Sequence, residues 1–222
     1  MANKKTVVIG AWDYPWNSDG AKGIHIFENG EKVKTILPDA NVGSQTFNEE
    51  TKVLYLTEEI TNGVLGPGSG GYIIAIRMTD GKLLSRVKTD GCNTTMCALS
   101  NDGKYLVVAH HDGPSVDCAD EKIGCPINLY KLNADGSIGV MVDRYIMKNE
   151  KKTQLHSIYS APGKDFFLVA DCGGDAIKTI KIVDEKIVET SKVVVEAGLN
   201  PRYCAFHPTL PIVYGNNERV PV

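Results

Sequence analysis

The sequence lacks the features that would assign it to a membrane, a nucleic acid or a secretion pathway. None of its apolar runs is long enough to span a bilayer, and the N-terminal stretch MANKKTVVIGAWDYPW has too short an apolar run for a signal-peptide core. The net charge is −3 over 222 residues, which gives no field that would attract nucleic acid or an anionic membrane. We therefore expect a cytoplasmic protein without nucleic-acid or membrane partners.

Cysteine spacing typical of zinc sites is also missing. The six cysteines, at positions 92, 97, 118, 125, 172 and 204, include no CxxC pair. Their even number is compatible with disulfides, but the lack of a secretion signal favours reduced thiols. The pairs 92/97 and 118/125 do not have usual zinc spacing, although His110 and His111 lie between them. We therefore predict no metal site and no cofactor.

Helix signals are almost absent, and short β-rich runs fill the chain instead. No long stretch shows the 3.6-residue period, whereas runs such as TVVIGA, KGIHIFE and EKVKTIL are separated by turn residues. Asn29-Gly30 lies between two such runs and predicts a hairpin, because both positions accept positive φ. Asp80-Gly81 and Asp135-Gly136 mark further turns. This pattern predicts an all-β fold.

One strand–turn–strand phrase recurs along the chain. When Tyr105, Phe166 and Ile212 are placed at equivalent positions, SNDGKY, APGKDF and HPTLPI align without a gap, and NEETKV joins them through Val53. The intervals between these positions run from 46 to 61 residues. A four-stranded unit of roughly 40–60 residues is typical of a β-propeller blade. A β-sandwich also has short strands and turns, but it gives no reason for the recurrence.

We therefore predict a single β-propeller domain over residues 1–222, built from four-stranded antiparallel blades. The predicted blades cover residues 6–37, 44–88, 93–147, 155–195 and 201–222, and the last of them is unfinished. In a propeller the first strand of each blade lines a central channel. Equivalent positions in successive blades therefore converge on one pocket although they lie far apart in sequence.

Two sets of equivalent positions are expected at one rim of this channel. At the start of the first strands the register places Gly43, Thr95, His156 and Arg202. Just after the second strands it places Glu59, His111, Cys172 and Glu218. The start of a first strand and the end of a second strand meet at the same edge of an antiparallel pair. The register thus brings an imidazole, a guanidinium and a carboxylate together.

His156, Arg202 and Glu218 form a chemically usable set. An imidazole can act as a general base near neutral pH. A guanidinium can hold a carboxylate or phosphate, or stabilise an oxyanion, and a glutamate can orient the histidine or activate water. Each residue alone also fits an ordinary role: a surface or hydrogen-bonded histidine, an ion-paired arginine and a loop glutamate.

The phrases GIHIF, SNDGKYLVVAHHDG, QLHSIYSAPGKDFFLVADCGGDAI and NPRYCAFHPTLPIVYGNNE also carry a family resemblance. They resemble segments of the seven-bladed propeller lactonases, the family of bacterial 6-phosphogluconolactonase and fungal carboxy-muconate lactonising enzymes. The last two phrases are the most specific. The resemblance implies that His156, Arg202 and Glu218 are the catalytic residues, the same three that the register selects.

The resemblance implies a lactonase-type hydrolase that opens a small sugar-acid lactone such as 6-phosphogluconolactone. His156 or Glu218 would activate a water, and Arg202 would bind the anionic group of the substrate or the developing oxyanion. We place Arg202, Thr95 and His111 in the substrate-binding set, with a small-molecule lactone as the partner and the oligomeric state open. The alternatives are a muconate-type lactone cyclase and a non-catalytic propeller that serves as a ligand- or protein-binding platform.

The chain departs from the family pattern at several points. The family has a histidine where this chain has Gln154, and its GPRH is NPRY here, with Tyr203 in place of the histidine. Asp171 and Asp175 match a DxGxD phrase, and we expect both to stabilise a turn. The family continues for more than two further blades. We therefore expect an incomplete propeller of about four and a half of seven blades, that is, a fragment.

Overall fold

The computed structural model describes residues 5–13, 22–60, 70–112, 124–148 and 152–219, and every regular element in this part of the chain is a β-strand. In chain order the strands are β1 (Thr6–Ala11), β2 (Gly23–Glu28), β3 (Glu31–Ile36), β4 (Val42–Asn48), β5 (Val53–Glu58), β6 (Tyr72–Arg77), β7 (Lys82–Lys88), β8 (Cys92–Leu99), β9 (Tyr105–Asp112), β10 (Cys125–Leu132), β11 (Ile138–Met147), β12 (Leu155–Ser160), β13 (Phe166–Asp171), β14 (Ala176–Val183), β15 (Lys186–Val194), β16 (Pro201–Phe206) and β17 (Val213–Asn217). The described residues contain no helix with the length and apolarity needed to cross a membrane.

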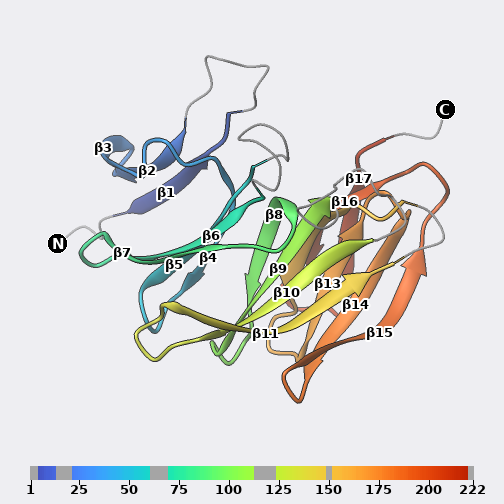
Figure 1. Cartoon of the computed structure of the whole chain (residues 1–222). Coiled ribbons are helices and arrows are strands. Elements are labelled where there is room, and N and C mark those ends of the chain that lie inside the picture. The colour runs from blue at the N-terminus through green and yellow to red at the C-terminus, as the bar shows by residue number, and fades with distance from the viewer. Residues whose placement is uncertain (1–4, 14–21, 61–69, 113–123, 149–151, 220–222) are drawn as a thin grey trace.

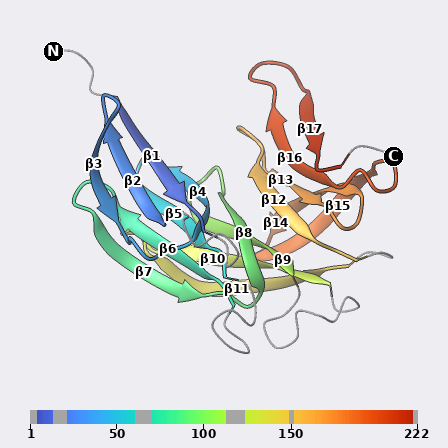
Figure 2. The same cartoon turned by 90° about the horizontal axis from the view of Figure 1, so that it is seen from above.

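The strands form five antiparallel sheets that follow one another along the chain. Three of them have four strands in sequence order: β4 to β7, β8 to β11, and β12 to β15. They are flanked by the three-stranded sheet β1 to β3 and the two-stranded sheet β16 to β17. Seen from above, the sheets fan out side by side from the blue N-terminal sheet to the red C-terminal one (Figure 2). This arrangement confirms the predicted all-β propeller of four-stranded antiparallel blades.

The first strand of each sheet contacts the first strand of the next. The contacts run from β1 to β4, from β4 to β8, from β8 to β12 and from β12 to β16. Side-chain hydrogen bonds tie these strands together: Gln45 Nε2 to Val8 O at 2.9 Å, Cys97 N to Ser44 Oγ at 3.2 Å, Thr95 Oγ1 to Leu155 O at 3.0 Å and Ser157 Oγ to Arg202 O at 2.7 Å. Residues that lie far apart in sequence are therefore held at the inner edge of the fan (Figure 1).

The core consists of apolar layers between neighbouring sheets. In β5, Val53 and Tyr55 pack toward the sheet of β8 to β11, whereas Leu54 and Leu56 pack toward the first sheet. Alternation along a strand sends successive side chains to opposite faces, so a strand covered on both faces needs a continuous apolar run. Full burial of one such aliphatic side chain stabilises the fold by about 1.5–3 kcal/mol.

The predicted turns lie between the expected strands. Asn29 and Gly30 join β2 to β3 with φ values of 53° and 92°. A two-residue hairpin in which both residues have positive φ matches the right-handed twist of the flanking strands, which confirms that prediction. Gly81 and Gly136, with φ values of 74° and 82°, occupy the turns after β6 and β10.

The cysteines depart from the expectation of reduced thiols. Cys92 is disulfide-bonded, whereas Cys97, Cys125, Cys172 and Cys204 are free and buried. The expectation is therefore wrong for Cys92, and Cys118 lies outside the described residues. A disulfide depends on two Cβ atoms that the fold brings within about 4 Å, which spacing along the sequence does not reveal.

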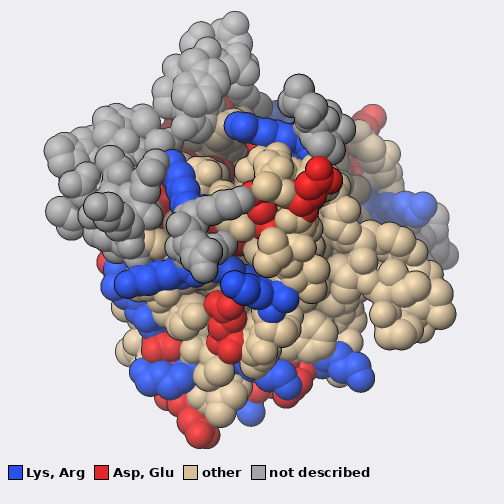
Figure 3. Space-filling view, turned by 90° about the vertical axis from the view of Figure 1, so that its right-hand side faces the viewer, with Lys and Arg blue, Asp and Glu red and all other residues tan. Residues whose placement is uncertain are grey.

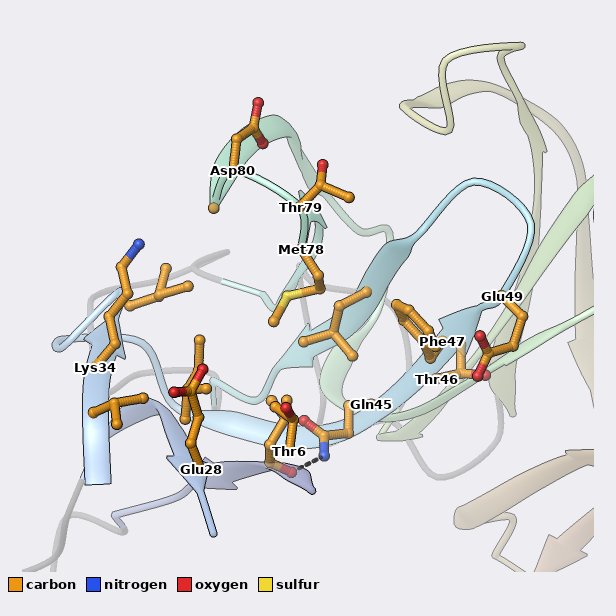
Figure 4. Close-up of a pocket in the computed structure, with 16 residues that line it drawn as sticks. Thr6, Glu28, Lys34, Gln45, Thr46, Phe47, Glu49, Met78, Thr79 and Asp80 are labelled. Carbon is orange, nitrogen blue, oxygen red and sulfur yellow. Dashed lines mark hydrogen bonds between the residues drawn. The ribbon is translucent and has the colours of Figure 1, made fainter. Parts of the chain in front are cut away.

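A groove of about 750 Å³ lies between the first sheet and the sheet of β4 to β7. Figure 4 shows Glu28 and Lys34 on one side of it and Phe47 and Glu49 on the other. Phe47 and Glu49 lie at the end of β4 where Asn48 pairs with Val53. The groove is therefore at the end of this strand pair opposite to the rim that carries the candidate catalytic residues.

Candidate active site

A β-bulge recurs at the start of the first strand in four successive sheets. The residue that each bulge leaves unpaired is Gly43, Thr95, His156 or Arg202, because the strand registers shift between Val42 and Ser44, Thr94 and Met96, Leu155 and Ser157, and Pro201 and Tyr203. These are the four positions that the sequence register makes equivalent. A bulge re-aims the extra side chain away from the normal alternation of the strand.

The second strands bring their terminal residues to the same rim. The backbone N–H groups of Glu59, Cys172 and Glu218 each donate to a carbonyl just before the facing first strand, at Asn41, Gln154 and Asn200 respectively, and all three bonds are 2.8 Å long. The repeated bond fixes these residues in one register with respect to the bulges. The rim thus has two layers of equivalent side chains.

Arg202 and Glu218 form an ion pair at this rim. Arg202 Nη1 lies 3.2 Å from Glu218 Oε1, and the two side chains are 35% and 39% exposed. The other Glu218 oxygen accepts a hydrogen bond from Cys172 Sγ at 3.4 Å. Burial, together with the neighbouring Glu218, raises the pKa of Cys172 to about 12. The thiol therefore stays protonated at neutral pH and acts as a donor rather than as a nucleophile.

His156 stands between Tyr203 and His111 in edge-to-face contacts. The ring centroids lie 5.1 Å from Tyr203 and 6.1 Å from His111. Burial, and then the positive charge of Arg202, lower the pKa of His156 to about 4, so the imidazole is neutral at pH 7. Its Nδ1 is buried and has no hydrogen-bond partner in the described part of the chain. The imidazole therefore retains an unused polar atom at the rim.

The predicted binding residues His111 and Thr95 have different surroundings. His111 Nδ1 lies 3.2 Å from Asp112 Oδ1, and this contact orients its ring. Thr95 is buried, and its hydroxyl lies within hydrogen-bond distance of the carbonyls of Leu155 at 3.0 Å and Ala109 at 3.3 Å. The observed contacts of Thr95 join β8 to β12. The part of Thr95 and His111 in substrate binding stays a prediction.

Asp171 and Asp175 hold the segments that lead into the bulges. Asp171 Oδ1 accepts hydrogen bonds from the backbone N–H groups of Gln154 and Gly174, both at 3.0 Å. Asp175 Oδ1 accepts from Gly198 at 3.0 Å and Asn200 at 3.2 Å. The expected stabilisation of a turn is therefore confirmed. In addition, each carboxylate anchors the residue two positions before His156 or Arg202.

Sequence reasoning placed Glu59 at the rim but gave it no role. Its side chain is partly buried, and burial raises its pKa to about 7, an effect that His111 and Arg202 oppose. The signal for this residue was its equivalence to Glu218, but its surroundings depend on the tertiary structure. No group of three or more His, Cys, Asp or Glu residues is arranged for a metal ion within the described ranges.

The match to a known protein family identifies the family to which this chain belongs. The model of a family described as "Lactonase, 7-bladed beta-propeller" matches residues 18–219. The chain belongs to this lactonase family. Its curated relatives include a 6-phosphogluconolactonase of Bacillus subtilis, 22% identical over 219 residues, and one of Formosa agariphila, 21% identical over 213 residues. The alignments cover 91% and 88% of this chain but 58% and 57% of the relatives.

Solved structures of other proteins share the fold. The periplasmic gluconolactonase PpgL of Pseudomonas aeruginosa superposes with a TM-score of 0.76 at 21% sequence identity, over 97% of this chain and 61% of that protein. An identity this low establishes the fold alone. The chain therefore spans less than two thirds of the length of these lactonase relatives.

Proposed function

We propose that the protein is a lactonase-type hydrolase that opens a small sugar-acid lactone such as 6-phosphogluconolactone. Membership of the lactonase family supports the reaction class, and the 6-phosphogluconolactonase relatives support the kind of substrate. The observation that carries the proposal is the repeated bulge, which sets His156 and Arg202 side by side with Glu218 at one rim. These three residues are the proposed catalytic set.

Arg202 is suited to stabilise the negative charge that develops during ring opening. When water attacks the lactone carbonyl, its oxygen becomes an oxyanion, and a prepositioned guanidinium lowers the energy of this state. Glu218 holds Arg202 at 3.2 Å, and the thiol of Cys172 fixes Glu218 in turn. The guanidinium is therefore oriented before substrate arrives and retains free N–H groups for an oxyanion or a carboxylate.

His156 is suited to orient the attacking water. Its imidazole is neutral at pH 7, so one ring nitrogen keeps a lone pair that can accept a hydrogen bond from that water or from a sugar hydroxyl. The water oxygen then bonds to the carbonyl carbon, the ring C–O bond breaks, and the ring oxygen leaves as a hydroxyl after it gains a proton. The product is the open-chain hydroxy acid.

The charged surface fits a small dissolved substrate better than a polyelectrolyte. Figure 3 shows Lys and Arg side chains interspersed with Asp and Glu side chains over one face of the molecule. The net charge of −3 agrees with this mixture. A surface without a field of one sign offers no track for a polyanion.

The proposal is tested by measuring acid release from glucono-δ-lactone and from its 6-phosphate, with the spontaneous rate subtracted. We expect Arg202→Met to lower kcat/KM by about 10²–10³-fold, as loss of an oxyanion donor does. Arg77→Met is the matched control, because Arg77 pairs with the exposed Asp80 in a turn at the opposite end of its sheet. Lack of acceleration by the wild-type protein on both lactones would refute the proposal and favour a binding platform.

A further inference from the structure

Glu59 occupies the same place in its sheet as Glu218 does in the last one. It follows β5, and its backbone N–H donates to Asn41 O at 2.8 Å, the bond that Glu218 makes with Asn200. One carboxylate oxygen of Glu218 pairs with Arg202, and the other accepts a hydrogen bond from Cys172. The Glu59 carboxyl forms no hydrogen bond or ion pair with any residue in the described part of the chain. The carboxyl groups of Glu59 and Glu218 thus occupy equivalent positions, but only that of Glu218 has partners in the described part of the chain.

The bulge at Gly43 makes room for the Glu59 carboxyl. A Cβ atom at position 43 would lie 2.8 Å from Glu59 Oε2 and 3.1 Å from Thr57 Oγ1. In the next sheets the same bulge position carries the side chains of Thr95, His156 and Arg202. The carboxyl of Glu59 therefore fills the space that the bulged residue's own side chain takes in its neighbours.

The charges around Glu59 come from across the rim. Burial raises the pKa of Glu59 to about 7, and Asp112 adds to this rise, whereas His111 and Arg202 act to lower it. His111 in turn lies 6.1 Å from the ring of His156. Glu59 thus lies within electrostatic range of Arg202, a member of the proposed catalytic set, and of His111, which contacts His156. A carboxyl that is partly ionised at neutral pH can both accept and return a proton.

We infer that Glu59 is a further catalytic residue, which takes a proton from the attacking water and delivers it to the leaving ring oxygen. This inference rests on the proposed lactone hydrolysis. In the first step, the Glu59 carboxylate removes one proton from water while the water oxygen bonds to the carbonyl carbon. In the second step, the ring C–O bond breaks and the Glu59 acid gives that proton to the departing oxygen. The second water proton remains on the new carboxylic acid, which then ionises to solvent.

The different contacts of Glu218 and Glu59 give the two carboxyl groups different roles. Glu218 pairs with Arg202 and holds the guanidinium in place, whereas Glu59 takes up and releases the proton. His156 orients the water but, with its pKa lowered to about 4, is a weak base at neutral pH. Proton transfer by Glu59 and oxyanion stabilisation by Arg202 are thus carried out by different residues.

The test compares Glu59→Gln with wild type on glucono-δ-lactone over pH 5–9. The wild-type kcat/KM is expected to rise as pH increases through about 7, because the ionised carboxylate is the base. Glu59→Gln is expected to lower kcat/KM by about 10²–10⁴-fold and to remove this rise. Glu50→Gln is the matched control: Glu50 is an exposed glutamate in the turn at the other end of the β4–β5 hairpin.

Two further variants address Glu59 without deleting its carboxyl. Glu59→Asp keeps the group on a shorter stem and should retain the pH-dependent rise at a lower rate. Gly43→Ala adds the Cβ that meets Oε2 at 2.8 Å and should displace the carboxyl, with a loss of about 10- to 100-fold. Gly43 does not have a positive φ, so alanine introduces no backbone strain there.

The outcomes separate the inference from the function on which it rests. If wild type does not accelerate lactone opening, the proposed function and the role of Glu59 both fail. If wild type is active while Glu59→Gln and Gly43→Ala keep its rate and pH profile, only the role of Glu59 is overturned.

A ¹³C NMR titration of the carboxyl groups tests the role of Glu59 without measuring turnover. A carboxyl that titrates near pH 7 in wild type and is missing in Glu59→Gln is expected, and its absence from wild type contradicts the inference.

Discussion

The buried ion pair of Lys178 and Asp171 allows a quantitative test of what stabilises the segment that leads to His156. Lys178 on β14 and Asp171 at the end of β13 have side chains that are 1% and 0% exposed, with Nζ 3.1 Å from Oδ2. Lys178 Nζ also donates to Lys148 O at 3.2 Å. Lys178→Met keeps most of the aliphatic stem but removes the ammonium. Asp171 is then left as a buried carboxylate without its counter-charge.

Removal of one partner from a buried ion pair destabilises a protein by about 3–5 kcal/mol, because the remaining charge cannot regain its hydration. Asp171 Oδ1 would keep its hydrogen bonds from Gln154 and Gly174, and this retained support favours the lower end, about 3 kcal/mol. Such a loss is a large share of a typical folding free energy of about 5–15 kcal/mol.

The assay is urea unfolding followed by far-UV circular dichroism. Lys181→Met is the control, since Lys181 lies three residues later on the same strand and pairs at 3.2 Å with Asp165, but both side chains are exposed, 37% and 82%. It should cost no more than about 1 kcal/mol. The double variant Lys178→Met, Asp171→Asn should recover part of the loss, because it leaves no buried charge. Equal midpoints for Lys178→Met and Lys181→Met would refute the reasoning.

Two further predictions concern the core. Burial lowers the pKa of His110 from 6.5 to about 4, so below pH 6.5 the unfolded chain binds a proton that the folded chain accepts only near pH 4. The contribution of neutral His110 to the free energy of unfolding should therefore be complete above pH 6.5. It should fall by up to about 3 kcal/mol as pH decreases toward 4. Urea midpoints measured against pH should show this fall, and His110→Gln should flatten it; an equal slope in the variant would contradict the assignment. Tyr55→Phe removes the buried hydroxyl that donates to Gly136 O at 2.8 Å and should destabilise the fold by about 1 kcal/mol in the same assay. No change there would mean that water replaces the bond.

The repeat is the part of the fold that could be predicted from sequence with most detail. Val53, Tyr105 and Phe166 each stand at or near the start of a second strand, as the aligned phrases require. The prediction works because each blade must bury both faces of its inner strands and turn at fixed places, which leaves apolar runs and Asn-Gly or Asp-Gly pairs in the sequence. The register then placed His156 and Arg202 at equivalent positions.

Other features of the site could not be predicted in this way. The bulge that leaves Gly43, His156 and Arg202 unpaired is a backbone irregularity, and no residue type in the sequence marks it consistently. The disulfide at Cys92 likewise depends on a distance that the fold sets. Both features depend on contacts between segments rather than on local propensity.

The sequence by itself determined that the chain is a repeated β fold with His156 and Arg202 at equivalent positions and Glu218 at the same rim. Those conclusions depend on recurring apolar runs and on turn chemistry, which are local features of the sequence. Only the tertiary structure decided which groups are charged there. It buried His156 beside Arg202, set Glu218 against the guanidinium, and placed Glu59 over a glycine, where desolvation brings its pKa to about 7. A side chain's protonation depends on its neighbours in space, and the fold alone assembles those neighbours.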